Sequence, residues 1–391
     1  MEYRAKKLTL FIIAYYHDPR LTRKVGGLIR VFDLADNLVK SGHKVSLFLP
    51  KLGDPKKQTL AEVVEVPFVD IPVLRPLSFH LISTLLLLVN LTSGVDFLYV
   101  RQMNSFIPLF LAKLYNIPTI FELPNDPYLA YQSYAPIERF MVKITDSLSM
   151  LMADRIVVLS EWSKRRLIKF SNIPRGRITV SPSGTDTELF RPLAKEECCA
   201  RLGMDPSFSY VGFVGSFLSN QGVDTLIDSA PRLLEKCAHL RFLLVGDGPM
   251  MHAWQEKVSE KGLQTAFFFC GQIPYREVPE HIGAMDICVA PHRKDSNQAS
   301  PVKMFDYMAC ARPIVASDIE VIREIVADSG CALLVAPERP DHLAMAIMRL
   351  LQDEKTAKSM SLKGREHVVD RFDRKKISQE LIQTLETLRA R

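Results

Sequence analysis

The sequence lacks the patterns that mark disulfide-bonded, metal-binding or nucleic-acid-binding proteins. Its seven cysteines are scattered, and none is spaced as Cys-x-x-Cys or as a metal site. We therefore expect reduced, mostly buried cysteines in a cytoplasmic protein. The 50 Lys and Arg exceed the 44 Asp and Glu by a net charge of +6. This excess is too small to predict nucleic-acid binding, although it would suit phosphate-bearing ligands or an anionic membrane.

A membrane-spanning run is also absent. The most apolar stretch, residues 77–91, is interrupted by His80, Ser83, Thr84 and Asn90, and it is shorter than the roughly 20 residues that a span needs. The N-terminus has a charged and then an apolar part, like a signal peptide, but the apolar part is short and lacks a small-residue cleavage site. We predict a buried first strand over residues 8–14 and no transmembrane helix.

What the sequence does contain is a regular alternation of strand and helix patterns. Short runs rich in β-branched and aromatic residues, typical of strands buried on both faces of a parallel sheet, occur at residues 44–49, 97–100, 119–121, 155–159, 211–214, 241–245, 287–290 and 313–316. Helical patterns separate them, for example over residues 28–39. A length of 391 residues suits two domains, so the sequence predicts an α/β protein with two doubly wound parallel sheets.

The boundary between the halves is predicted within residues 185–192, after Ser181-Pro182-Ser183-Gly184. We place the first domain at residues 1–187 and the second at residues 188–373. The amphipathic pattern over residues 374–391 predicts a closing helix that packs back on the first domain.

Two glycine-bearing turns follow strands of the second half. Gly215 and Ser216 follow the first, in a loop that includes Gln221, and Gly246 and Gly248 follow the second. A turn into a helix start presents amide groups to which phosphate binds, and ligands bind at this edge of doubly wound sheets. Each turn is equally explained as a plain βα connection.

The segment from Gln298 to Asp306 is more informative. A polar loop leads into a helix whose first turn carries Pro301 and Lys303, so that amide groups, helix dipole and a cation converge. One turn further, Asp306 is a carboxylate of the kind that binds the two hydroxyls of a ribose. This arrangement favours a phosphorylated sugar, and a solvated loop with a salt-bridged lysine is the alternative.

These residues and others resemble one known family. The similarity is carried by Asp154-Arg-Ile-Val-Val-Leu-Ser160, Pro182-Ser-Gly-Thr-Asp-Thr-Glu-Leu-Phe-Arg-Pro192, Val245-Gly-Asp-Gly-Pro249, Ser300-Pro-Val-Lys-Met-Phe-Asp-Tyr-Met-Ala309 and Pro313-Ile-Val-Ala-Ser317. In this order they resemble the retaining, family-4 glycosyltransferases of the GT-B fold. The resemblance extends over nearly the whole chain and implies two Rossmann-like domains that face a cleft.

The resemblance also implies a donor site for a nucleotide sugar. Relatives carry a Glu, seven residues and a second Glu, which hold the transferred sugar and the ribose; here these positions are Gln298 and Asp306. The donor-binding residues implied or indicated are Gly26, Gly27, Gly215, Ser216, Gln221, Gly246, Gly248, Gln298, Ala299, Ser300, Pro301, Val302, Lys303 and Asp306.

The chain departs from the family at the phosphate. Many relatives carry an Arg near position 216 and a Lys near position 221, where this sequence has Ser216 and Gln221. We expect Lys303 to compensate, with Arg293 or Lys294 from the same loop. The predicted catalytic residues are therefore Gln298, Lys303 and Arg293. No metal or other cofactor is expected, since no Asp-x-Asp cluster stands in a suitable loop.

Candidate residues in the first half are fewer. The region after residues 119–121 often supplies a histidine in relatives; here Asn125 either contacts substrate or forms a turn before Pro127. Gly26 and Gly27 resemble the glycine loop of the family, beside Arg23 and Lys24, which suit an anionic acceptor or form a solvated pair. His17 and Asp18 are interpreted as turn formers.

Residues 74–91 have two interpretations, a core helix or an apolar face that lies on a membrane beside a lipid-linked acceptor. The expected function is transfer of a sugar from a UDP- or GDP-sugar to a glycan, a lipid-linked saccharide or a small molecule, in the cytoplasm or at the inner face of the cell membrane. A scaffold that has lost catalysis is the alternative, and a nucleotide-sugar epimerase is a weaker one.

Overall fold

The computed structural model describes residues 7–15, 26–51, 59–71, 74–91, 94–102, 105–131, 135–296, 298–326 and 329–389. The chain forms two compact units. The first comprises Met1–Ser183 and Arg374–Arg391, and the second comprises Gly184–Asp373. The chain thus leaves the first unit at Ser183, a few residues before the boundary that we placed after residue 187, and its last helix belongs to the first unit.

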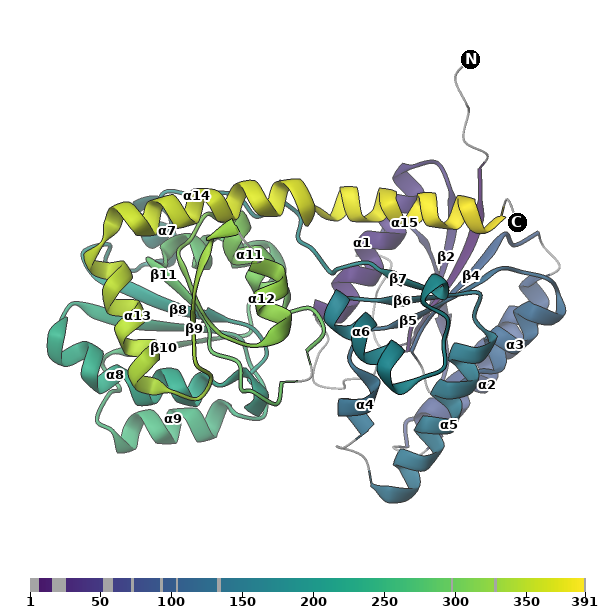
Figure 1. Ribbon diagram of the computed structural model, residues 1–391, viewed down its shortest axis with the longest axis horizontal. Coiled ribbons are helices and arrows are strands. Elements are labelled where there is room, and N and C mark those ends of the chain that lie inside the picture. The colour runs from purple at the N-terminus through teal and green to yellow at the C-terminus, as the bar shows by residue number, and fades with distance from the viewer. Residues whose placement is uncertain are drawn as a thin grey trace, which may run out of the picture. The chain divides into compact units, whose positions relative to one another are not determined.

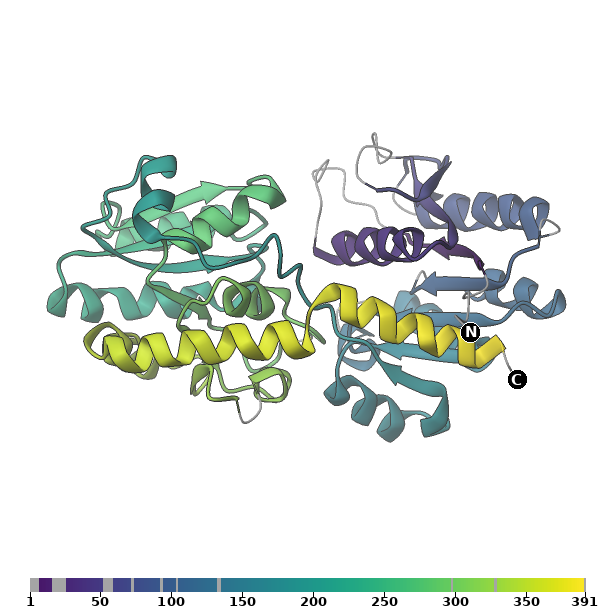
Figure 2. The same ribbon diagram turned by 90° about the horizontal axis from the view of Figure 1, so that it is seen from above.

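The first unit is built on a seven-stranded parallel sheet (Figures 1 and 2). Its strand order is β3 (Glu62–Val66), β2 (Lys44–Pro50), β1 (Thr9–Ile13), β4 (Phe97–Arg101), β5 (Thr119–Leu123), β6 (Arg155–Val158) and β7 (Ile178–Val180). The central strands are buried on both faces, as their continuous apolar runs predict.

Helices cover both faces of this sheet. On one face, α1 (Gly26–Lys40) and α15 (Arg374–Arg389) pack with β1 and β2 in a single core. On the other face lie α2 (Leu74–Leu91), α3 (Ile107–Leu114), α5 (Pro136–Met152) and α6 (Glu161–Phe170). The short α4 (Pro127–Ala130) follows β5. None of the helices among the described residues is long and apolar enough to cross a membrane.

The second unit repeats this architecture with a six-stranded parallel sheet. Its order is β10 (Phe267–Gly271), β9 (Leu240–Val245), β8 (Ser209–Val214), β11 (Ile287–Ala290), β12 (Ile314–Ser317) and β13 (Ala332–Val335). The strand order reverses between β8 and β11, which is where ligands bind in open α/β sheets.

The helices of the second unit again lie on both faces of the sheet. Neighbouring residues of β8 show this: Val211 packs with α8 (Val223–Lys236), α9 (Met251–Glu260) and α13 (Pro340–Gln352), whereas Tyr210 packs with α7 (Lys195–Leu202) and α10 (Val278–Ala284). The remaining helices are α11 (Val302–Ala309), α12 (Glu320–Val326) and α14 (Glu354–Arg371). The predicted fold of two doubly wound parallel sheets is confirmed.

Candidate functional site

Three loops at the carboxyl edge of the second sheet meet around the switch in strand order. They follow β8, β9 and β11. The loop after β9 packs directly on the loop after β8: a Cβ on Gly246 would lie 1.9 Å from the Gly215 carbonyl oxygen, and one on Gly248 would lie 2.7 Å from that of Phe217. Both glycines are therefore required by this contact, whatever the loops bind. Ser216, in the loop after β8, is exposed.

Helix α11 is held against the end of β8 and β11 by one buried hydroxyl. The Val214 amide donates to the Tyr307 hydroxyl at 2.8 Å, and that hydroxyl faces the Val289 carbonyl at 3.4 Å. The helix spans Val302–Ala309, and Pro301 is its capping residue rather than part of its first turn. A proline side chain has no polar atom with which to cap the first amide groups of a helix, which suits an anion at this end.

Lys303, in the first turn of α11, is buried at the same edge. Its ammonium group donates to the Gln221 side-chain oxygen and lies 4.5 Å from the centre of the Phe213 ring. Its chain passes Gly215 so closely that a Cβ there would lie 2.9 Å from Cε of Lys303. Burial lowers the pKa of Lys303 to about 7, although the Asp306 carboxylate acts in the opposite direction.

Gln298 contacts a histidine that the sequence did not single out. Nε2 of His292 lies 2.9 Å from Oε1 of Gln298, and Nδ1 lies 3.3 Å from the Ala290 carbonyl. Burial and the nearby Lys303 lower the pKa of His292 to about 3, so the ring is neutral. When Nδ1–H donates to the Ala290 carbonyl, Nε2 carries no proton and acts as an acceptor. The side-chain NH₂ group of Gln298 donates to Nε2 once the oxygen and nitrogen of this amide are assigned the other way round. The adjacent Asn297 lies outside the described residues.

Asp306, the predicted ribose ligand, is buried one turn into α11. Its Oδ1 accepts a hydrogen bond of 2.6 Å from the hydroxyl of Thr185, itself fully buried. Thr185 is a second residue that sequence reasoning missed, because 121 positions separate it from its partner.

Arg293, predicted to act with Lys303, is tied to carboxylates of two other elements. Its guanidinium lies 3.1 Å from Glu338 and 3.9 Å from Asp224. Its amide donates to the Asn220 carbonyl at 3.1 Å. These contacts connect the loop after β11 to α8 and to the loop after β13. In the structure Arg293 therefore has a structural role, because it holds these segments together. Its catalytic role stays a prediction.

Of the residues predicted in the first unit, the structure describes Gly26, Gly27 and Asn125. Gly26 and Gly27 are the first residues of α1, whereas Arg23, Lys24, His17 and Asp18 lie outside the described residues. Asn125 is exposed after β5, and its neighbour Asp126 caps α4 by accepting from the Leu129 amide at 2.8 Å. The turn that we described as one role of Asn125 is thus formed around Asp126, and a substrate contact by Asn125 stays a prediction.

The first unit also contains a buried ionic cluster that we did not predict. Glu122 is the penultimate residue of β5 and accepts from Arg101 at 2.9 Å, from Arg30 of α1 at 3.1 Å and from the Tyr99 hydroxyl. Burial acts to raise the pKa of Glu122, but the two guanidinium groups outweigh it and the net pKa is lowered. The signal in the sequence was a glutamate inside an apolar strand, since a buried carboxylate requires a partner.

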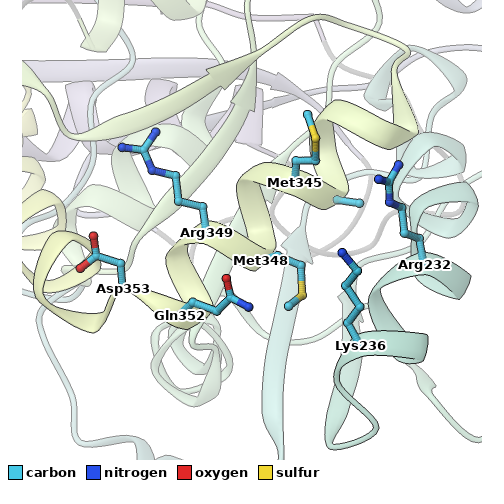
Figure 3. A pocket seen from close by; sticks show the side chains of 8 residues that line it. Arg232, Lys236, Met345, Met348, Arg349, Gln352 and Asp353 are labelled. Carbon is cyan, nitrogen blue, oxygen red and sulfur yellow. The ribbon is translucent and has the colours of Figure 1, made fainter.

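A cavity of about 320 Å³ lies elsewhere in the second unit, between α8 and α13 (Figure 3). Arg232 and Lys236 line it from the end of α8, opposite Met348 and Arg349 of α13. Because α8 starts at the carboxyl edge of the sheet, its end lies at the opposite edge. The cavity is therefore separate from the loops around Lys303. Among the described residues, no group of three or more His, Cys, Asp or Glu could hold a metal ion.

Each of the two units matches a known family model. Residues 26–189 match the model of Glycosyltransferase Family 4, and residues 209–353 match that of Glycosyl transferases group 1. Similar proteins include alpha-D-kanosaminyltransferase of Streptomyces kanamyceticus, 22% identical over 66% of this chain and 67% of its own. Another is alpha-maltose-1-phosphate synthase of Mycolicibacterium smegmatis, 27% identical over 61% of this chain and 63% of its own.

Solved structures show the same fold. Sucrose-phosphate synthase from Thermosynechococcus elongatus superposes with a TM-score of 0.79 at 20% identity, over 98% of this chain and all of that one. Anabaena HepE, solved in complex with UDP-glucose, superposes with a TM-score of 0.78 at 17% identity, over 97% of this chain and all of that one. The two family models together span most of both units, and the chain thus resembles the family-4 glycosyltransferases and has the GT-B fold of its structural neighbours.

Proposed function

We propose that this glycosyltransferase takes its sugar from a nucleoside-diphosphate sugar whose diphosphate binds between Lys303 and the start of α11. The observation that carries the proposal is the buried ammonium group of Lys303, beside Gly215 at the end of β8. Burial disfavours the protonated form of Lys303 in the free protein. A bound phosphate would favour the protonated form and accept hydrogen bonds from it. The solved complex of HepE with UDP-glucose supports a donor of this class.

In this proposal the leaving diphosphate is stabilised by Lys303 and by the amide groups of α11. The bond from the anomeric carbon to the phosphate oxygen breaks, while a bond from that carbon to the acceptor oxygen forms on the same face. The acceptor proton passes to the departing phosphate oxygen, and the configuration is retained. Gln298, an amide, would orient hydroxyl groups of the sugar rather than act as a nucleophile. With the diphosphate neutralised in this way, we propose that no metal is required.

A thermal-shift panel of UDP, GDP and ADP in the presence of EDTA tests the donor site. We expect one nucleotide to raise the melting temperature of the wild type and of Lys358→Ala, which removes an exposed lysine of α14. The same nucleotide should give little shift with Lys303→Ala, because the charged partner of the phosphate is lost. Equal shifts in all three proteins would place the nucleotide elsewhere.

Turnover separates the enzyme from its alternative. Gln298, where relatives carry a glutamate, is the observation that favours a scaffold without catalysis. Slow hydrolysis of the matching nucleotide sugar, reduced in Lys303→Ala, is expected of the enzyme, and the anomer released first can be identified by NMR. Nucleotide binding without any hydrolysis or transfer would instead support the scaffold, and release of an inverted sugar would refute same-face displacement.

A further inference from the structure

Three helices of the first unit present large apolar side chains to the solvent. On α2 the exposed residues are Leu74, Leu77, Leu81, Leu85 and Val89; on α3 they are Ile107, Phe110 and Leu114; on α5 they are Ile137, Phe140, Met141, Ile144 and Leu151. In each helix these positions recur at intervals of three or four residues or their multiples, so they form one outward stripe. We call these thirteen residues the apolar face.

The stripes are not a by-product of core packing. In α2 the polar residues His80, Ser83 and Thr84 point inward with Phe79 and Leu87, while the leucines of the stripe are 43 to 63% exposed. A helix of a soluble α/β domain normally has the reverse pattern, with its polar side outward. The core interpretation of residues 74–91 is thus confirmed for one side of the helix; the other side is apolar surface, for which contact with a membrane stays a prediction.

The three helices that carry the stripes are neighbours. Helix α3 contacts both α2 and α5, and the three helices lie together in Figure 1. All three helices cover the same face of the sheet, where they share one core. Thirteen large side chains that are about half exposed present on the order of 1,000 Å² of apolar area, compared with roughly 300–600 Å² for the largest patch on an ordinary monomer. A surface of this size requires a partner.

The charges of these helices indicate which partner. Helix α2 carries Arg75 and α3 carries Lys113, and neither helix contains an acidic residue. Helix α5 carries Arg139 and Lys143, with Glu138 as its one exposed acid, since Asp146 is buried. Arg75 pairs with Asp70 of the preceding loop. A broad apolar surface with basic residues at its margin is complementary to the headgroups and upper acyl chains of an anionic bilayer.

We propose that the apolar face docks this protein on a membrane that contains anionic phospholipid. The apolar side chains would enter the headgroup region, and Lys113 and Lys143 would contact phosphates. Docking is independent of the nucleotide site, because the apolar face lies wholly in the first unit and Lys303 lies in the second.

Vesicle sedimentation of the full chain tests the proposal. Vesicles of phosphatidylcholine and phosphatidylglycerol in equal parts should bind the wild type at least about tenfold more tightly than the Leu81→Glu, Leu85→Glu variant, since two charges replace inserted leucines. The matched control, Met345→Glu with Leu362→Glu, changes two exposed apolar residues of the second unit and should bind like the wild type. Nucleotide thermal shifts, unchanged in both variants, show that each remains folded and that the two proposals are separable.

A second variant preserves the apolar residues and reverses charge. Lys113→Glu with Lys143→Glu should remove the preference for phosphatidylglycerol over pure phosphatidylcholine, and added salt should do the same to the wild type. Binding that is equal in the wild type and in the leucine variant would overturn the proposal. A second result would also overturn it: no vesicle binding, together with a wild-type dimer in sedimentation velocity that becomes monomeric in the leucine variant. The apolar face would then bind a second copy of this chain.

Discussion

Lys303→Met should weaken nucleotide binding by a factor that depends on pH. The substitution keeps most of the length of the side chain beside Gly215 and Phe213 and removes only the charge. In the free protein burial lowers the pKa of Lys303 to about 7, below the ordinary value for a lysine. A bound phosphate favours the charged form, so above that pH binding must take up a proton, and wild-type affinity falls as pH rises through about 7.

The size of the effect follows from two terms. A hydrogen bond between charged groups contributes about 1.5 to 3 kcal/mol, so at about pH 6 the wild type should bind roughly ten- to a hundredfold more tightly than Lys303→Met. At about pH 8.5 the lysine must first be protonated, which costs about 2 kcal/mol for a group some 1.5 units above its pKa. The advantage of the wild type should then shrink to a few-fold at most.

Isothermal titration calorimetry with the nucleotide selected by the thermal-shift panel measures both terms. Titrations at each pH, in two buffers of different ionisation enthalpy, give the affinity and the number of protons taken up. Lys303→Met supplies the baseline for ionisation of the nucleotide itself, and Lys358→Met is the matched control. The reasoning fails if the ratio of wild-type to Lys303→Met affinity is the same at both pH values, or if it is close to one at about pH 6.

Two further substitutions test buried polar groups. Asp146, buried on α5, accepts from Gln102 at 2.5 Å and from the Tyr131 hydroxyl at 3.0 Å, and burial raises its pKa to about 6. The contribution of Asp146 to stability is therefore largest at acid pH and is lost as pH rises from about 4 to 6. Asp146→Asn should be more stable than the wild type by about 1 to 3 kcal/mol at pH 7 and nearly equal to it at pH 4. Urea unfolding at the two pH values measures this difference. Gln298→Glu places a carboxylate, which only accepts, at 2.9 Å from Nε2 of His292, so Nε2 must carry a proton and the pKa of the histidine should rise; imidazole ¹⁵N shifts that report an unprotonated Nε2 would contradict this arrangement.

The central strands of both sheets could be predicted from the sequence, and the edge strands could not. The predicted runs correspond to the nine inner strands, such as β5, in which every residue is buried. The four strands without a predicted run are β3, β7, β10 and β13, which are the edges of the two sheets. Their residues are mostly half-exposed, so they lack the continuous apolar run that burial on both faces imposes.

The candidate site was predictable only where its residues follow one another along the chain. The segment from Gln298 to Asp306 is recognisable because a loop, a proline and a helix start are adjacent in sequence. The partners that define its chemistry come from elsewhere: Gln221 for Lys303, Thr185 for Asp306, and Val214 for Tyr307. The contact of Lys303 with Gln221 spans 82 positions, and no local pattern indicates such a pair before the fold is known.

Gln221 and Gln298 stand where many relatives carry a charged residue, and the structure shows a partner for each. A lysine at position 221, as in many relatives, would place a second ammonium group against Lys303; Gln221 instead supplies an oxygen that accepts from it. A glutamate at position 298 would add a buried negative charge beside His292, whereas Gln298 contacts the neutral ring without adding a charge. One substitution removes a cation and the other removes an anion. We propose that Lys303 then assists departure of the diphosphate, with no carboxylate at position 298 to attack the sugar.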